Sequence, residues 1–137
     1  MKISGINHIN IVTTPAQLAD VVTFYEQIIG LKQGLRAPSK RDGAWLYCGD
    51  TAIIHVSVVP EPPYAGADTP INHVALACSD VGACMQNLAR NHIVYTMDYR
   101  SPPEMTQLFL YDPAGVRIEL NFAGEQPPTL QEHTHDT

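Results

Sequence analysis

Two histidines occur in nearly the same short phrase, once in each half of the sequence. His8 lies in INHINI (residues 6–11) and His73 lies in INHVAL (residues 71–76), so the two are 73 − 8 = 65 residues apart. Both phrases alternate between apolar and polar residues, which predicts β-strands. A histidine that recurs in the same strand context is a candidate for a shared chemical role.

A second matched pair comes from the far end of the same repeat. When LYCGDTAIIHV (residues 46–56) is aligned without a gap with LYDPAGVRIEL (residues 110–120), the offset is 110 − 46 = 64 and His55 coincides with Glu119. Leucine and tyrosine match at the start of both segments. Similarity at a nearly constant offset indicates a duplicated structural unit.

We call His8, His55, His73 and Glu119 the candidate ligands. Alternation along each predicted strand places them on the more polar face, and a pseudo-twofold relation between the halves would bring them together. Three imidazoles and one carboxylate suit a borderline divalent ion such as Zn, Ni, Co, Fe or Mn. A single strand histidine is usually structural or exposed, so the metal hypothesis depends on the matched positions of all four.

The elements that must position these side chains follow the same order in both halves. In the first half, Thr14 is the expected N-cap, Pro15 the first helical residue and Gly30 the end of a helix. In the second half, Ser79 and Asp80 are expected to cap a helix. The predicted strands are 3–12, 33–37, 44–48 and 51–59 in the first half and 71–78, 93–99, 106–111 and 115–122 in the second.

This order predicts an α+β fold made of two tandem βαβββ modules. We expect a single domain over residues 1–122, with module one at 3–59, a proline-rich connector at 60–70, module two at 71–122 and a polar, flexible tail at 123–137. A chain of 137 residues is long enough for one domain with a real core.

Composition excludes several classes of function. The net charge of −6 and the scattered basic residues argue against a nucleic-acid partner, and no apolar run is long enough to span a membrane. The only basic cluster, Arg36, Lys40 and Arg41, fits a solvated loop better than an anion site. Three cysteines without paired spacing and no signal-like start predict a reduced, cytoplasmic protein.

Several motifs together resemble the vicinal oxygen chelate superfamily. They are NHINI, NHVAL, FYEQIIGLK (residues 24–32) and DPAGVRIELNF (residues 112–122), and the resemblance covers residues 3–122. This superfamily includes glyoxalase I, methylmalonyl-CoA epimerase, fosfomycin-resistance thiol transferases, extradiol dioxygenases and bleomycin-resistance proteins. The resemblance implies a curled mixed sheet around a metal cup, one divalent ion per site, and a homodimer whose sites form within one chain or across two.

The resemblance also implies roles for the candidate ligands. In glyoxalase I all four places bind metal, but the place of His55 is normally a glutamate. In extradiol dioxygenases the places of His8, His73 and Glu119 hold Fe(II), and a nearby histidine like His55 handles protons. Glu119 is therefore the first candidate for a catalytic base and His55 the second, and His55 is either a ligand or a proton-transfer group.

Strand alternation also suggests which side chains contact a substrate. Residues expected on the same faces as the candidate ligands are Asn10, Trp45, Tyr47, Gln107, Phe109 and Tyr111. Aromatic residues in strands more often belong to the core, which is the alternative for each of them. Together they predict a partly apolar pocket for a small carbonyl or aromatic compound.

These observations favour a glyoxalase-like, metal-dependent isomerase or lyase that stabilises an enolate-type intermediate. The main alternative is an extradiol-type dioxygenase with a two-histidine, one-carboxylate Fe(II) site. A thiol transferase is disfavoured because no rich basic pocket for a phosphonate is visible. A non-catalytic drug-binding resistance protein remains an alternative from a different class, although such proteins usually lack the candidate ligands.

Overall fold

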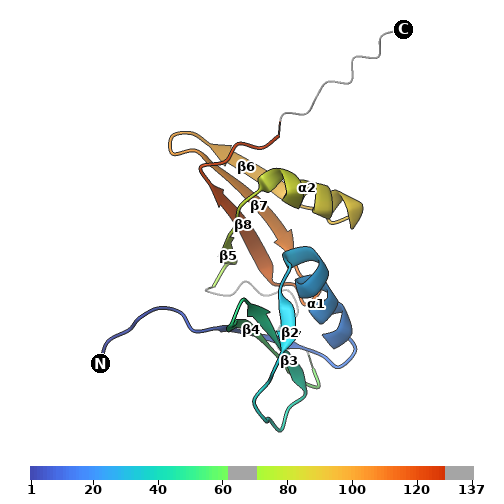
Figure 1. Ribbon diagram of the computed structural model, residues 1–137. Helices are drawn as coiled ribbons and strands as arrows, with labels where there is room; N and C mark the ends of the chain where they lie inside the picture. Colours follow the sequence, from blue (N-terminus) through green and yellow to red (C-terminus); the bar gives the residue numbers. More distant parts are fainter. Residues whose placement is uncertain (62–70, 129–137) are drawn as a thin grey trace. The chain divides into compact units, whose positions relative to one another are not determined.

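The computed structural model describes residues 1–61 and 71–128 (Figure 1). The chain divides into two compact units, each described by itself below. Unit 1 comprises Met1–Val74 together with Tyr111–Arg117, and unit 2 comprises Ala75–Leu110 and the chain from Ile118 onward. Most of the expected connector and the end of the expected tail, residues 62–70 and 129–137, lie outside the described residues.

Unit 1 contains a four-stranded sheet with the strand order β1-β4-β3-β2. Its strands are β1 (Ile9–Thr13), β2 (Lys32–Gly34), β3 (Gly43–Cys48) and β4 (Thr51–Val58). β1 is parallel to β4, whereas the β4–β3 and β3–β2 pairs are antiparallel. Between β1 and β2 the chain forms α1 (Leu18–Phe24), which continues as a π-helical turn, η1 (Tyr25–Ile29).

The two faces of this sheet differ in character. Residues at every second position are buried, because the side chains of a strand alternate between its faces. The buried apolar residues of the strands and of the adjoining helix are Ile11, Ala44, Leu46, Ile54, Val56, Val21, Phe24 and Tyr25. Trp45 and His55 lie at the alternate positions and remain partly exposed, so they belong to the opposite face.

Unit 2 repeats this arrangement with the strand order β5-β8-β7-β6. Its elements are β5 (Val74–Ala77), α2 (Val81–Arg90), β6 (Thr96–Arg100), β7 (Met105–Tyr111) and β8 (Arg117–Ala123), of which the terminal residues Val74, Tyr111 and Arg117 are assigned to unit 1. The buried apolar residues are Val81, Leu88, Leu108, Leu110, Ile118, Leu120 and Phe122. The α+β class and the two tandem βαβββ modules are thus confirmed.

Both Asn-His phrases lie just before a strand, which corrects the predicted boundaries. The strand expected at 3–12 begins at Ile9, and the strand expected at 71–78 begins at Val74. Alternation predicts that a segment can form a strand, but the strand exists only where a partner pairs with it, and pairing of β1 with β4 begins at Ile9↔Ile54. His8 and His73 therefore sit at strand entrances.

The first helix also begins later than predicted. Gln17 N–H donates to the Thr14 carbonyl, so residues after Thr14 form a turn, and α1 begins at Leu18 with Gln17 as its N-cap. The predicted end is confirmed, because Gly30 adopts a left-handed conformation with φ of 86°. Asp80 is confirmed as the N-cap of α2, where its carboxylate accepts from Ala83 N–H at 3.0 Å.

The strand expected at 93–99 starts three residues later, at Thr96. The reason lies at the end of α2, where the N–H groups of His92 and Ile93 donate to the carbonyls of Ala89 and Leu88. These bonds close the helix and keep Ile93 out of the sheet. None of the helices in the described ranges has the length and apolar character needed to traverse a bilayer.

Candidate functional site

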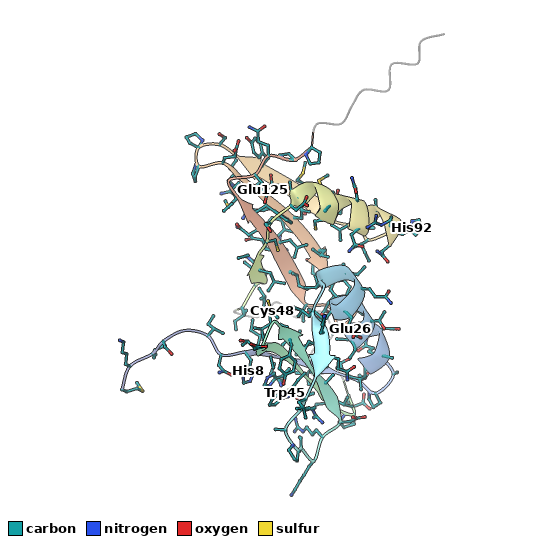
Figure 2. The ribbon with its side chains drawn as sticks, viewed as in Figure 1. His8, Glu26, Trp45, Cys48, His92 and Glu125 are labelled. Atoms are coloured by element: carbon teal, nitrogen blue, oxygen red, sulfur yellow. The ribbon has the colours of Figure 1, made fainter. Side chains whose placement is uncertain are left out.

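Three rings stack on the polar face of the sheet in unit 1. Trp45 and His55 are register partners on β3 and β4, and their ring centroids lie 4.0 Å apart at an interplanar angle of 12°. His8 stacks on His55 with a centroid distance of 3.7 Å and an angle of 10°. Figure 2 labels His8 and Trp45 in this unit. The structure therefore brings together two of the candidate ligands and one predicted substrate contact.

Each Asn-His phrase contains an internal hydrogen bond. Nδ1 of His8 lies 2.8 Å from Oδ1 of Asn7, and Nδ1 of His73 lies 2.8 Å from Oδ1 of Asn72. The asparagine in the repeated phrase thus holds the histidine that follows it. The repeated asparagine is visible in the sequence, but its role as a partner of the histidine is visible only in the structure.

Arg117 settles which nitrogen of His73 carries the proton. Its Nη1 donates to Asn72 Oδ1 at 2.8 Å, and a guanidinium can only donate. The atom facing both partners must therefore be the amide oxygen, so Nδ1 of His73 is the donor. In the neutral ring this leaves the lone pair on Nε2, the nitrogen suited to binding a metal ion. Nδ1 of His8 faces Oδ1 of Asn7 at the same distance, so the same tautomer is expected for His8.

His55 has a different environment. Partial burial lowers its pKa, the charge of His8 and, more weakly, that of Arg36 act in the same direction, and a hydrogen bond to the Ala52 backbone opposes them. The ring is therefore neutral at pH 7, with one nitrogen bonded to the backbone. Contact with Trp45 on one face and His8 on the other fixes its orientation.

Glu119 lies in unit 2 within a group of amides. It is 6 % exposed, and its Oε1 accepts from Gln107 Nε2 at 2.7 Å while its Oε2 accepts from Asn121 Nδ2 at 3.1 Å. Both oxygens are thus held in place. Within the described residues, the buried Oε1 of Gln107 has no hydrogen-bond partner. Such an orphaned acceptor marks a position where a donor or a cation would be stabilised.

The donor chemistry of these residues fits a divalent ion, although their arrangement shows no complete site. In the described ranges no three His, Cys, Asp or Glu side chains are grouped closely enough to hold one metal ion. His8 and His73 present Nε2, and Glu119 supplies an oriented carboxylate, which is a suitable N/O set. The parallel rings of His8 and His55 direct their in-plane lone pairs side by side, so these two do not converge on one ion.

The predicted substrate contacts have several environments. Asn10 Nδ2 donates to Ser57 Oγ at 3.0 Å on the face that carries the ring stack. Tyr47 packs its ring over Gly34 and donates its hydroxyl to the Leu35 carbonyl, so it stabilises β2. Its contribution to a pocket stays a prediction.

The two remaining predicted contacts lie on β7. Phe109 is partly buried in unit 2, and Tyr111 is 63 % exposed and belongs to unit 1. Sequence reasoning missed Asn7, Asn72 and Asn121, because their importance depends on which partner they face. Only the repetition of the Asn-His phrase could have drawn attention to the first two.

Comparison with known proteins gives the family. The model of the Glyoxalase/Bleomycin resistance protein/Dioxygenase superfamily matches residues 5–120. No protein with a curated description matches the chain. A glyoxalase family protein from Bacillus anthracis is similar in structure, with a TM-score of 0.69, 25 % identity and coverage of 90 % of this chain and 98 % of that one.

Two further solved structures share the fold. A glyoxalase/dioxygenase from Nostoc punctiforme has a TM-score of 0.71 at 19 % identity, covering 89 % of this chain and 92 % of its own. A lactoylglutathione lyase from Agrobacterium tumefaciens has a TM-score of 0.62 at 18 % identity, covering 89 % and 96 %. At these identities the likeness shows the fold alone. With the family model spanning both modules, the chain belongs to the glyoxalase/bleomycin resistance protein/dioxygenase superfamily.

Proposed function

We propose that the protein is a metal-dependent, glyoxalase-like isomerase or lyase acting on a small oxygenated substrate. The observation that carries this proposal is the matched anchoring of His8 and His73, each of which holds Nδ1 on the preceding asparagine. A hydrogen bond from Nδ1 to a fixed acceptor is typical of histidines that bind metal through Nε2. Two such histidines at equivalent places of a duplicated fold are a specific arrangement.

His8, His73 and Glu119 are the ligands in this proposal, drawn from one chain or from two copies of it. The ion is one of the borderline divalent metals Ni, Co, Zn, Fe or Mn. When bound, it supplies Lewis-acid stabilisation of negative charge on neighbouring substrate oxygens. Gln107 and Asn121 hold the Glu119 carboxylate in one orientation, as partners of a ligating carboxylate should.

His55 is the proton-transfer group in this proposal. Its ring is clamped between Trp45 and His8 and cannot converge with His8 on an ion. A hydrogen bond to the Ala52 backbone occupies one ring nitrogen, so in the neutral ring the other can accept a proton from the substrate carbon. Glu119, the first candidate for a base from sequence, is better suited to ligation because both of its oxygens are held by amides.

The substrate contacts follow from the same faces. Trp45 offers a flat apolar surface beside the histidines, and Asn10 lies on the same face. The unsatisfied Oε1 of Gln107 is an acceptor for a substrate hydroxyl or a bound water. Tyr47, Phe109 and Tyr111 remain proposed contacts. A homodimer in the cytoplasm is the proposed form of the enzyme.

One observation favours a second candidate function, a ring-cleaving dioxygenase. If His55 is not a ligand, the remaining set is two histidines and one carboxylate, the facial triad of non-haem Fe(II) oxygenases. His55 would then serve as the neighbouring proton-transfer group. The two candidates share ligands and differ in the metal and in the use of oxygen.

Metal content and oxygen consumption distinguish these functions. Full-length protein purified without chelator should contain about one divalent ion per site, and His8→Ala and His73→Ala should each abolish stoichiometric binding. His55→Ala should keep the metal and lose turnover. His92→Asn is the matched control, because it removes an exposed imidazole and asparagine tolerates its φ of 55°.

Two results would change the conclusion. Stoichiometric Fe(II) with oxygen uptake on catechols would replace the isomerase by the dioxygenase. Failure to bind any metal, even after titration, would refute both catalytic functions and leave a drug-binding role. Ni, Co or Zn without oxygen chemistry supports the isomerase or lyase.

A further inference from the structure

Arg36 is the most unusual charged residue in unit 1. The sequence suggested a solvated loop around Arg36, Lys40 and Arg41, and Lys40 and Arg41 are indeed exposed. Arg36 differs because it is partly buried and its Nε is inaccessible and without a hydrogen-bond partner among the described residues. Its Nε is therefore desolvated without a partner, which a loop cation usually avoids.

Arg36 lies beside the part of β3 that precedes Trp45. The pairing of β2 with β3 ends at Gly34↔Trp45, and Arg36 follows two residues later, next to Gly43. Gly43 is two residues from Trp45 on β3, so the two positions share the face on which Trp45 stacks on His55. Arg36 Nη2 would lie 3.0 Å from a Cβ at Gly43, which confirms that the guanidinium lies over this glycine.

Gly43 makes room for this guanidinium. A Cβ at this position would come within 2.0 Å of the Val56 carbonyl oxygen and 3.0 Å of Arg36 Nη2, so no larger residue fits without displacing its neighbours. The guanidinium is held by a hydrogen bond from Nη2 to the Arg41 carbonyl at 2.6 Å. The loop thus fixes Arg36 beside the candidate site.

No counter-ion within the described residues balances this charge. The nearest acidic residue along the loop, Asp42, uses Oδ1 to accept from the Gly43 N–H at 2.9 Å. Arg36 therefore keeps Nη1 and the second N–H of Nη2 for a ligand. A guanidinium presents its N–H groups in a planar fork that matches a carboxylate.

We propose that Arg36 binds a carboxylate of the substrate at the edge of the face that carries His8, His55 and Trp45. This inference rests on the proposed function and names its substrate class, a small carbonyl compound that also bears a carboxylate. The carboxylate lies at Arg36 and the remainder of the molecule lies against Trp45. The protein, with a net charge of −6, thus keeps one local cation for an anionic substrate.

Trp45 is the only tryptophan, so fluorescence excited selectively from tryptophan reports on this face alone. The test titrates metal-free, full-length protein with benzoylformate, a 2-oxo acid with an aromatic ring, and separately with its uncharged methyl ester. Benzoylformate should quench Trp45 saturably. Arg36→Met should weaken its binding about tenfold or more, the range of a charge-assisted hydrogen bond, and leave ester binding unchanged.

Two further variants make the result decisive. Lys40→Met removes an exposed cation from the same loop and should change benzoylformate binding less than twofold. Arg36→Lys keeps the positive charge but lacks the planar set of N–H donors, so it should bind benzoylformate with intermediate affinity. It serves as the test variant if Arg36→Met does not fold.

The proposal is wrong if Arg36→Met binds benzoylformate as well as the original protein does. It is also wrong if Arg36→Met weakens the binding of benzoylformate and of its methyl ester by the same factor. Equal losses in Lys40→Met and Arg36→Met would also overturn it, since they would indicate attraction by the whole loop. The titration needs neither metal nor turnover. Failure of metal binding in the experiments above would therefore be recognised separately.

Discussion

The hydrogen bond between Asn72 and His73 leads to a prediction about the ring tautomer. Asn72→Leu preserves the approximate volume of the side chain and removes the oxygen that accepts from His73 Nδ1 and Arg117 Nη1. Without this acceptor, the neutral His73 ring should shift toward the tautomer protonated at Nε2. That tautomer cannot ligate through Nε2, so metal affinity should fall.

The size of the effect follows from the geometry. A neutral hydrogen bond contributes about 1 kcal/mol net, so its loss changes the tautomer ratio about fivefold. Partners that orient a ligating histidine typically contribute about 10–100-fold to metal affinity. Asn72 and His73 are both exposed, so water can replace the lost acceptor, and we expect a loss of affinity of about tenfold. Asn72→Asp, which keeps an acceptor beside Arg117, should retain the tautomer.

The assay has two parts on the same full-length protein. Long-range ¹H–¹⁵N correlation of the imidazole rings at alkaline pH, without metal, identifies the protonated nitrogen of His73. Competition with a chromophoric chelator then measures the affinity for Zn or Co. Asn91→Leu is the control. Asn91 is also an exposed asparagine, and among the described residues its side chain donates only to Asn87.

Either part can refute the reasoning. If His73 in Asn72→Leu remains protonated at Nδ1, Asn72 does not set the tautomer. If the tautomer shifts while metal affinity stays unchanged, Nε2 of His73 is not a ligand, and the proposed ligand set is wrong. A loss of affinity in Asn91→Leu of similar size would show that the effect is not specific to the Asn-His phrase.

The buried Tyr25–Asp112 hydrogen bond and the cysteines give further predictions. Tyr25→Phe leaves Asp112 Oδ2 without its 2.7 Å donor and should cost about 1–3 kcal/mol of unfolding free energy, measured by urea denaturation. Burial raises the pKa of Asp112 above its ordinary 3.8, although hydrogen bonds from Tyr25 and the backbone oppose this shift. The folded protein therefore holds the proton of Asp112 more tightly than the unfolded chain does. The stability that this proton contributes is complete below pH 3.8 and is lost as the pH rises through the folded-state pKa. The stability of the original protein relative to Asp112→Asn should therefore increase on acidification, and an unchanged difference would contradict the assignment. Burial raises the pKa of Cys84 to about 11, so iodoacetamide at pH 8 should alkylate the exposed Cys48 before Cys84. Mass spectrometry measures the two alkylation rates, and equal rates would contradict the burial of Cys84.

The parts of the fold that the sequence predicts well are those determined by local periodicity. Alternation in β3 and β4 correctly predicted that Trp45 and His55 share a face, because a period of two needs no knowledge of the partner strand. The start of β1 was missed because it depends on pairing with β4. The helix start was missed because a turn at Thr14 competes with capping.

The site was predictable only in part for a similar reason. Residue type suggested the candidate ligands, but the partners that define their chemistry depend on register and side-chain packing. Arg117 on Asn72 and Asn121 on Glu119 are contacts that no spacing rule indicates. Arg36 shows the same limit, because the sequence does not distinguish a solvated loop arginine from one whose Nε is buried without a partner.

The surroundings of His55 and Glu119 differ in a way that suits an imidazole in one repeat and a carboxylate in the other. At the offset of 110 − 46 = 64, Gly43 corresponds to Gln107 and Ser57 corresponds to Asn121. The second module has amides at both places, and these amides donate to the two oxygens of Glu119. A buried carboxylate needs such donors, whereas a neutral imidazole does not.

In the first module the same two places serve other purposes. Gly43 leaves space for the Arg36 guanidinium, and Ser57 accepts a hydrogen bond from Asn10. A cation there is compatible with a neutral ring at His55, because it disfavours the charged imidazolium. The difference between an imidazole and a carboxylate at this repeat position is therefore matched by differences in the residues around it. The Asn-His phrases, by contrast, have the same sequence and the same internal hydrogen bond in both modules.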